Sequence, residues 1–288
     1  MEEDETAPPL VSIVTPSLNQ GTYIEEAIQS VLAQDYPRVE HIVVDGGSTD
    51  GTVEILRRHP HLRWVSEPDA GQAAAINKGF RMASGEIYGW LNADDYYLPG
   101  AVTAAVDVMR DSDCAFVHGG WRQIREDGTL IRDVAPLPFD YRRQLEHVNG
   151  VCQPGSFFTR DAFWAVGGVD ETYQYAMDYE LWLKLGARFP VRHVDRIQAA
   201  YRYHGSSKSM AQYGAFVPET LRASRSHGGR FFSRLYLDWY LPRERPWVNR
   251  LLVAFRLIRT RDLRALRRGI ARQRRFLSDR ARHDRHRL

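Results

Sequence analysis

Short apolar runs alternate with longer amphipathic stretches through the first 112 residues, and this alternation restricts the fold more than any other feature. Four runs rich in β-branched and aromatic residues have the length of strands: 11–15, 40–45, 62–66 and 87–91. Apolar residues at helical spacing follow each of them, over 22–34, from Thr52, over 71–82 and after Pro99. Such alternation forms parallel βαβ units in a sheet covered by helices on both faces. The sequence therefore predicts an α/β, Rossmann-like fold that binds ligands at the carboxyl ends of its strands.

The pattern after Cys114 is looser and indicates a mixed second part. It predicts a hairpin over 121–134 that turns at Asp127-Gly128 and a helix of about a dozen residues from Met177. The other expected strands are 157–159, 191–194 and 197–203. Residues 205–230 are rich in Ser and Gly and resemble a flexible loop or linker.

Small and acidic residues follow every strand of the first part. The strand ends read TPSLN, DGGSTDG, EPDAGQ and NADD, and parallel strands bring such ends to one rim. The adjacent carboxylates Asp94 and Asp95 repel each other, so they need either bulk water or a cation. A rim this acidic would repel phosphates unless a metal were present. It therefore suits a sugar nucleotide held through a divalent cation.

The order of these motifs resembles the family 2 glycosyltransferases of the bacterial cell-surface or exopolysaccharide type, which have the GT-A fold. The resemblance covers roughly residues 10–205. Its elements occur in the family's order: TPSLN, VVDGGSTDGT, DAGQAAAINKG, GWLNADD, MDYELWLKL and YRYHGSSKS. One such element arises easily by chance, but six in order are specific.

The resemblance implies a donor site on the rim. Asp45 would hydrogen-bond the nucleobase in a pocket lined by Thr15 and Pro16, with Asn19 near the nucleotide. The remaining donor-side residues that it implies are Gly71 and Asn77 under the ribose and diphosphate, and Asn92, Ala93 and Asp94 at the fourth strand. Asp94 matches the carboxylate that binds Mn²⁺ or Mg²⁺, and a hard cation on a diphosphate favours carboxylate oxygen.

This chain departs from the family's DxD form at its first position, where Asn92 replaces an aspartate. An asparagine offers a carbonyl oxygen but no charge, so we expect metal affinity to depend more on Asp94 and the phosphates. His204 matches a histidine that completes the metal site in some relatives, and an imidazole ligand favours manganese over magnesium. A structural histidine is the alternative for His204, and an Asx turn that caps the next helix is the alternative for NADD.

The resemblance places the general base at Asp178. Asp178 and Glu180 lie two residues apart, so on a helix they point in nearly opposite directions and only one can face the cleft. A base must remove the proton of the acceptor hydroxyl as it attacks, and the first turn of a helix favours its ionised form. A plain N-terminal helix acid is the alternative. Acceptor-side residues implied by the resemblance are Gln153, Ser156 and Trp182, with a core aromatic as the alternative for Trp182.

These motifs predict a metal-dependent inverting glycosyltransferase. It would move a sugar from a nucleotide-sugar, with a UDP-sugar favoured, to a hydroxyl of a glycan or lipid-linked acceptor. Two alternatives stay open: a nucleotidyltransferase, although TPSLNQG lacks the glycine-rich basic phosphate loop of that class, and a non-catalytic sugar-nucleotide-binding protein. No GxGxxG follows the first strand and no P-loop is present, which disfavours dinucleotide and P-loop enzymes.

The charge distribution suggests a second role at the end of the chain. Residues 243–288 hold sixteen Arg and four acidic residues, a net charge of +12, so the preceding 242 residues carry −9 of the total of +3. Apolar and basic residues alternate there as in helices that lie in a membrane interface. We expect docking on the inner membrane leaflet. The alternative is that the apolar stripe packs on the body or on a second subunit of a homo-oligomer. No nucleic-acid recognition module is evident, so we expect no nucleic-acid partner.

The expected organisation follows from these patterns. Two isolated cysteines, an acidic N-terminus and the lack of an eighteen-residue apolar run favour a cytoplasmic protein, at most peripheral to a membrane. We expect five segments: a disordered N-terminus (1–9), a nucleotide-sugar-binding half (10–112), an acceptor-binding half (113–205), linker and helices (206–242) and a basic amphipathic helical tail (243–288).

Overall fold

The computed structural model describes residues 7–147, 149–205, 207, 213–234 and 236. The chain divides into two compact units, Met1–Leu235 and Tyr236–Leu288, and the fold and the site described below belong to the first. The expected basic tail over 243–288 lies outside the described residues, as do residues 1–6 of the expected disordered N-terminus. Pro8 and Pro9 are described, and their carbonyl oxygens accept hydrogen bonds from Arg38 and Tyr36.

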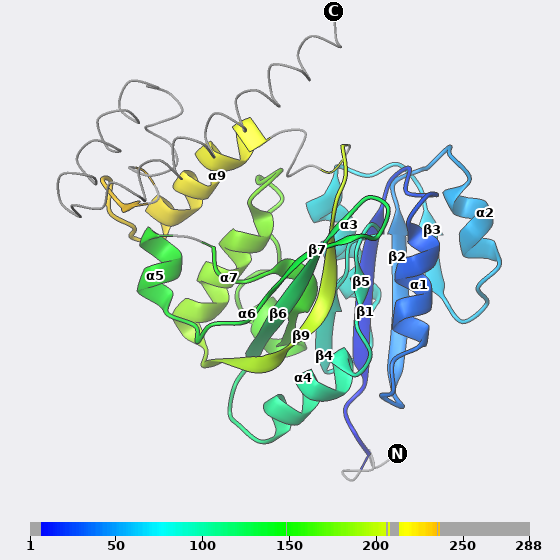
Figure 1. The fold of residues 1–288 in the computed structure, drawn as a ribbon, viewed down its shortest axis with the longest axis horizontal. Coiled ribbons are helices and arrows are strands. Elements are labelled where there is room, and N and C mark those ends of the chain that lie inside the picture. Colours follow the sequence, from blue (N-terminus) through cyan, green and yellow to red (C-terminus); the bar gives the residue numbers. More distant parts are fainter. Residues whose placement is uncertain (1–6, 148, 206, 208–212, 235, 237–288) are drawn as a thin grey trace, which may run out of the picture. The chain divides into compact units, whose positions relative to one another are not determined.

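The first four strands are parallel, as the alternating pattern predicts. β1 (Val11–Ser17) lies between β2 (Val39–Asp45) and β4 (Ile87–Trp90), and β3 (Arg63–Ser66) pairs with β2. The connecting helices are α1 (Ile24–Leu32), α2 (Thr52–Arg57) and α3 (Gln72–Met82), and α4 (Ala101–Arg110) follows the fourth strand. The carboxyl ends of β1, β2 and β4 therefore meet at one edge of the sheet (Figure 1).

The second part extends the same sheet with mixed strand directions. The sheet has nine strands in the order β3-β2-β1-β4-β8-β6-β9-β5, with β7 paired to β6. The added strands are β5 (Tyr96–Tyr97), β6 (Phe116–Arg125), β7 (Leu130–Val134), β8 (Ser156–Thr159) and β9 (Val191–Tyr203). β8 runs antiparallel to β4 and to β6, so β6 and its parallel partner β9 run in the direction of the first four strands.

Side chains on the two faces of the sheet enter separate cores. On β1, Ile13 packs toward α1 and α4, whereas Val14 packs toward α3, α6 (Arg160–Ala165) and α7 (Met177–Arg188). All these side chains are fully or almost fully buried because successive strand residues point to opposite faces. The near-continuous apolar runs of the sequence are thus explained by helices on both faces.

Two expectations about the second part need correction, and one helix lies where no element was predicted. Strands 191–194 and 197–203 form one strand, β9, whose pairing with β6 shifts in register near Gly119 and Gly120. The polar stretch before Gly155 contains α5 (Tyr141–Glu146). Most of the expected loop at 205–230 is the helix α9 (Tyr213–Ser226), which contains a proline, Pro218. Tertiary packing of its buried apolar side chains overrides the weak local helix signal.

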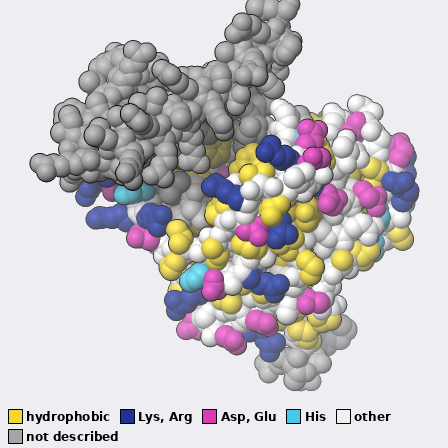
Figure 2. Space-filling view, viewed as in Figure 1, with side chains coloured by type: hydrophobic (Ala, Val, Ile, Leu, Met, Phe, Trp, Pro, Cys, Tyr) yellow, Lys and Arg dark blue, Asp and Glu magenta, His cyan; other side chains and the backbone are white. Residues whose placement is uncertain are grey.

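Charges of both signs are interspersed on the face of the described residues that Figure 2 shows. A single-signed patch does not dominate this view, although the first 242 residues carry a net charge of −9. None of the helices within the described part of the chain is long and apolar enough to cross a membrane.

Candidate active site

A cleft of about 400 Å³ opens at the carboxyl ends of β1 and β4. The expected site residues that line it are Pro16, Gly71, Asn92, Ala93, Asp94, Gln153 and Asp178. They come from the ends of strands, from the start of α3, from the short turn Gln153–Gly155 and from the start of α7. The structure therefore brings the donor-side and acceptor-side motifs to one cleft.

Asn92 is committed to hydrogen bonds within the floor of this cleft. Its Oδ1 accepts from Nε1 of Trp90 at 2.8 Å and from Nε2 of Gln72 at 2.9 Å. Its Nδ2 donates to Oε1 of Gln153 at 2.8 Å. The expected metal-facing carbonyl oxygen is thus already occupied by two donors, and Asn92 acts as a connector between α3 and the turn at Gln153.

Asp94 and His204 form a pair at the rim of the cleft. Oδ2 of Asp94 lies 2.9 Å from Nε2 of His204, and the His204 side chain is almost fully buried. Two ligands at right angles on one Mg²⁺ or Mn²⁺ ion, each at about 2.1 Å, also lie about 3 Å apart. A carboxylate and an imidazole at this separation fit one divalent ion that replaces the hydrogen bond between them.

Within the described residues, the protein supplies few metal ligands beyond this pair. Among the described residues, no group of three or more His, Cys, Asp or Glu side chains could hold a metal ion. The rest of a coordination shell would come from water and the diphosphate, as is usual for magnesium at phosphate sites.

The buried Arg202 side chain holds the loop that carries Asp94. The Arg202 guanidinium donates to the carbonyl oxygens of Asp94 at 3.1 Å and Glu126 at 3.0 Å, and it pairs with the Glu26 carboxylate. The backbone N–H of Arg202 donates to Asp95 at 2.9 Å. Burial and the neighbouring Asp94 charge raise the pKa of Asp95 well above its usual range. Asp95 is therefore a supporting residue of the loop, since only 2% of it is exposed.

Asp178 lines the cleft from the first turn of α7. Burial raises the pKa of Asp178 to about 6, although the backbone N–H groups of Asp178 and Tyr179 stabilise the ionised form. Glu180 points away, is buried, and pairs with Lys184 at 3.0 Å and His227 at 3.4 Å. Asp178 is thus the member of this acidic pair whose carboxylate reaches the cleft.

The remaining donor-side residues have defined local roles. Thr15 is buried, with its Oγ1 2.9 Å from Nε2 of His41. Asn19 has a positive φ of 53° and its Oδ1 accepts from the Thr49 backbone N–H at 3.0 Å. The fully buried Asp45 accepts hydrogen bonds from the backbone and hydroxyl of Ser48 and from the hydroxyl of Ser66. A nucleobase contact of Asp45 would have to replace or share one of these bonds, so that contact stays a prediction.

Three more expected site residues lie in the protein interior. Trp182 is fully buried and stacks on Phe116 with ring centroids 4.8 Å apart, so the expected sugar-stacking role is wrong and the core alternative holds. Asn77 exchanges two hydrogen bonds with the backbone of Val169 instead of facing a diphosphate. Ser156 is fully buried and donates to the Cys152 carbonyl oxygen at 2.9 Å. In each case the residue occupies the inward face of its element.

Sequence reasoning missed several residues that share the lining of the cleft with Gln153 and Asp178. Tyr175, Tyr201 and Phe216 line it together with Gln174 and Ser207. Tyr201 and Ser207 lie within the motif YRYHGSSKS and Tyr175 lies two residues before MDYELWLKL, so their position was a usable signal. Phe216 lies on α9, which the Ser- and Gly-rich composition concealed.

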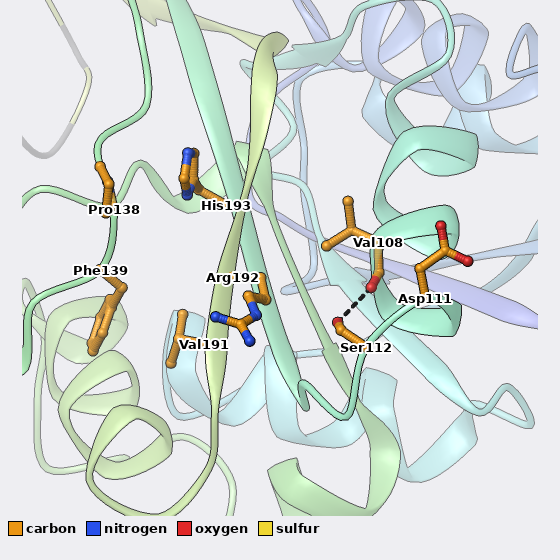
Figure 3. A pocket seen from close by; sticks show the side chains of 8 residues that line it. All are labelled: Val108, Asp111, Ser112, Pro138, Phe139, Val191, Arg192 and His193. Atoms are coloured by element: carbon orange, nitrogen blue, oxygen red, sulfur yellow. Dashed lines mark hydrogen bonds between the residues drawn. The ribbon is translucent and has the colours of Figure 1, made fainter.

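A second hollow, of about 370 Å³, lies at the opposite edge of the sheet (Figure 3). It lies between the end of α4, the start of β9 and the loop at Pro138 and Phe139, and its lining includes Asp111 and His193. Ser112 donates to the Val108 carbonyl oxygen at 2.6 Å on its wall. None of the expected site residues lines this hollow, so the candidate active site is the cleft at the carboxyl ends of the strands.

The sequence of this chain matches one protein family and is similar to several bacterial enzymes. The family model for Glycosyl transferase family 2 matches residues 12–167. A chondroitin synthase from Escherichia coli is 33% identical over 207 residues, which are 70% of this chain and 30% of that protein. A hyaluronan synthase from Pasteurella multocida is 30% identical over 211 residues, 72% of this chain and 22% of the synthase. The chain thus spans less than a third of the length of either synthase.

A shorter relative and two solved structures extend the comparison. An uncharacterised glycosyltransferase from Mycobacterium tuberculosis is 35% identical over 183 residues, 62% of this chain and 70% of that protein. The mannosyltransferase PcManGT from Pyrobaculum calidifontis, solved with GDP-Man and Mn²⁺, has a TM-score of 0.64 and 22% identity, covering 94% of this chain and 81% of that one. Staphylococcus aureus TarS with UDP-GlcNAc has a TM-score of 0.61 and 17% identity, covering 76% and 66%. These structures confirm the expected GT-A fold of the first unit.

Proposed function

The chain belongs to glycosyl transferase family 2, and we propose that it moves a sugar from a nucleotide-sugar to an acceptor hydroxyl with inversion at the anomeric carbon. The observation that carries this proposal is the content of one cleft. Asp94, paired with His204, and Asp178, whose pKa is raised to about 6, line the same cavity from different elements. A direct displacement needs one side that holds the donor phosphates and, opposite it, a general base for the acceptor hydroxyl.

The donor in this proposal is a nucleotide-sugar, with a UDP-sugar as the first choice. Asp94 and His204 would hold Mn²⁺ or Mg²⁺ on the donor diphosphate. The bound ion would offset the charge that develops on the nucleoside diphosphate leaving group. Solved structures of similar fold contain UDP-GlcNAc or GDP-Man, which supports the donor class and leaves the base and the sugar open.

Asp178 acts as the general base in this proposal. Its carboxylate takes the proton of the acceptor hydroxyl while that oxygen attacks the anomeric carbon and the bond to the diphosphate breaks. A pKa near 6 leaves Asp178 ionised at neutral pH yet closer to the working pH than an ordinary aspartate, which favours proton transfer. One displacement inverts the configuration, so an α-linked donor gives a β-linked product.

The acceptor in this proposal is a glycan, free or lipid-linked. Tyr175, Tyr201 and Phe216 line the acceptor side of the cleft, and aromatic rings provide apolar faces on which sugar rings pack. Gln153 lines the same cavity and can offer its amide to sugar hydroxyls only by sharing its bonds to Asn92 and to the Trp90 carbonyl oxygen.

A panel of donors tests the proposed reaction. Purified protein with Mn²⁺ is offered UDP-, GDP- and dTDP-sugars together with short glycans, and released nucleoside diphosphate is measured. We expect one donor class to support transfer, with an inverted anomeric configuration by NMR. Release of pyrophosphate would indicate a nucleotidyltransferase instead. Binding of a sugar nucleotide without release of any product would indicate a non-catalytic binder.

We also propose that the basic tail, residues 243–288, docks the enzyme on an anionic membrane surface as a peripheral protein. Its net charge of +12 supports this, since each Lys or Arg near an anionic surface adds about 1 kcal/mol of attraction. Full-length protein should co-sediment with anionic vesicles and be released by salt, whereas a chain ending at Tyr240 should stay in solution. Equal behaviour of the two chains would instead assign the tail to self-association or packing.

A further inference from the structure

The helix α9 lies beyond the residues matched by the family model and docks on the segment that leads into α7. The Glu219 carboxylate accepts hydrogen bonds from three consecutive backbone N–H groups. These donors are Gln174 at 3.0 Å, Tyr175 at 2.7 Å and Ala176 at 3.0 Å. One side chain of α9 therefore holds the whole backbone turn before α7.

This turn controls the position of the candidate base. Ala176 is the residue that caps α7, and it makes no side-chain capping hydrogen bond. N–H groups at the start of a helix need acceptors, and a negative charge there also interacts favourably with the helix dipole. Glu219 supplies an acceptor for the Ala176 N–H and a negative charge near the start of α7, from a distant part of the chain. Asp178 follows Ala176 by two residues, and Gln174 and Tyr175 line the cleft themselves.

Two further contacts fix α9 against the same segment. The Arg222 guanidinium lies 3.8 Å from the centre of the Tyr173 ring and donates to the Thr172 carbonyl oxygen at 2.9 Å. On the same side of α9, Phe216 lines the cleft one turn before Glu219. The helix thus combines an anchor on the start of α7 with a wall of the acceptor side.

We propose that Glu219 is a positioning residue for the transfer reaction, and this inference rests on the proposed function above. By fixing the turn 174–176, Glu219 places the Asp178 carboxylate and the Phe216 ring at a set separation on the acceptor side. Displacement of a reacting group by about 1 Å can lower a rate by about 10²-fold. Most of the expected donor side, Pro16 and Asn92 to Asp94, lies at the ends of β1 and β4, and only Gly71 lies beside the Gln174 side chain of this turn.

The Glu219→Gln variant tests this separation of roles in the full-length protein. A glutamine keeps the size but loses the charge, and with its oxygen in the place of Oε2 it turns its N–H₂ group toward the Gln174 N–H in the place of Oε1. We expect the kcat of transfer to fall at least about tenfold while the Kd for the nucleotide-sugar with Mn²⁺ stays within about twofold. We also expect faster amide hydrogen exchange at residues 174–176. The matched control is Glu54→Gln, an exposed glutamate paired with Arg57 at 3.6 Å, which should change none of these.

The readouts distinguish positioning from a structural role. Faster exchange at 174–176 with an unchanged kcat would overturn the proposal, and so would a parallel loss of donor affinity and kcat. If Glu219→Gln fails to fold, Arg222→Gln loosens the same segment more gently and should lower kcat with the donor Kd unchanged; an unaltered kcat there would overturn the proposal. A wild-type protein that transfers no sugar would refute the proposed function itself, whereas wild-type turnover by Glu219→Gln would refute this inference alone.

Discussion

Replacement of Asp178 by asparagine should raise the stability of the protein while it abolishes most of the activity. Burial raises the pKa of Asp178 from 3.8 to about 6, so the folded protein binds this proton more tightly than the unfolded chain does. A group whose pKa is raised by folding stabilises the folded state fully at low pH. This contribution to the free energy of unfolding is lost as the pH rises from about 3.8 to about 6. A difference of about 2.2 pH units, at about 1.36 kcal/mol each, makes the ionised carboxylate cost up to about 3 kcal/mol at pH 8.

The Asp178→Asn variant removes this cost because an amide has nearly the same shape and no charge. We expect its free energy of unfolding at pH 8 to exceed the wild-type value by up to about 3 kcal/mol, with about half of that gain left at pH 5. Turnover should fall by about 10²-fold or more, a typical contribution of a general base. A carboxylate selected for catalysis rather than for packing gives this combination of gain and loss.

Urea denaturation of the ligand-free protein, followed by far-UV circular dichroism at pH 5 and pH 8, measures the effect. The transition midpoint should shift without a change in slope, which indicates a change in stability alone. Asp161→Asn is the control, because the Asp161 side chain is 90% exposed and its variant should match wild type at both pH values. A variant of Asp178 that is no more stable than wild type at pH 8, or equally stabilised at both pH values, would refute the reasoning.

Three further predictions follow from the same cleft. The kcat/KM of wild type should fall about tenfold per pH unit below pH 6, as Asp178 becomes protonated, and a flat profile down to pH 5 would place the base elsewhere. Chelation should abolish transfer and Mn²⁺ should restore it, while Asp94→Asn should lose the metal-dependent part of nucleotide affinity by calorimetry; full turnover in excess chelator would contradict the metal pair. Asn92→Asp should lower the free energy of unfolding by about 1–3 kcal/mol, because Oε1 of Gln153 loses its donor, and unchanged stability in urea would contradict the assigned network.

The fold could be predicted from the sequence wherever the local pattern and the tertiary packing agree. The four parallel strands and the helix from Met177 are such cases, because a buried strand or an amphipathic helix leaves a periodic apolar signature. α9 is the opposite case. Its helix contains Pro218 and lies beside glycines, and it is stable because Val217, Leu221 and Ala223 are buried against the body. Such packing depends on residues far away in the chain, which no local pattern reports.

The site shows the same division between what motifs indicate and what packing decides. The family resemblance was enough to expect Asp94, Gln153 and Asp178 at one cleft, and all three line it. The motifs could not tell which face of an element a residue occupies. Trp182 follows Asp178 by four residues, yet it is fully buried against Phe116 while Asp178 reaches the cleft. Residues four apart lie on nearly the same face of a helix, so tertiary packing, which the motif does not report, decides which of the two is covered.

Asn92 shows why a departure from a motif can be a requirement of the structure. Nε2 of Gln153 donates to the Trp90 carbonyl oxygen, so Oε1 of Gln153 has to face Asn92 and needs a donor there. An aspartate at this position could still accept from Trp90 and Gln72, but it could not donate to Gln153. It would also add a third carboxylate beside Asp94 and Asp95. The neutral amide therefore joins α3 to the turn at Gln153, and in the proposed reaction it leaves Asp94 as the carboxylate for the ion.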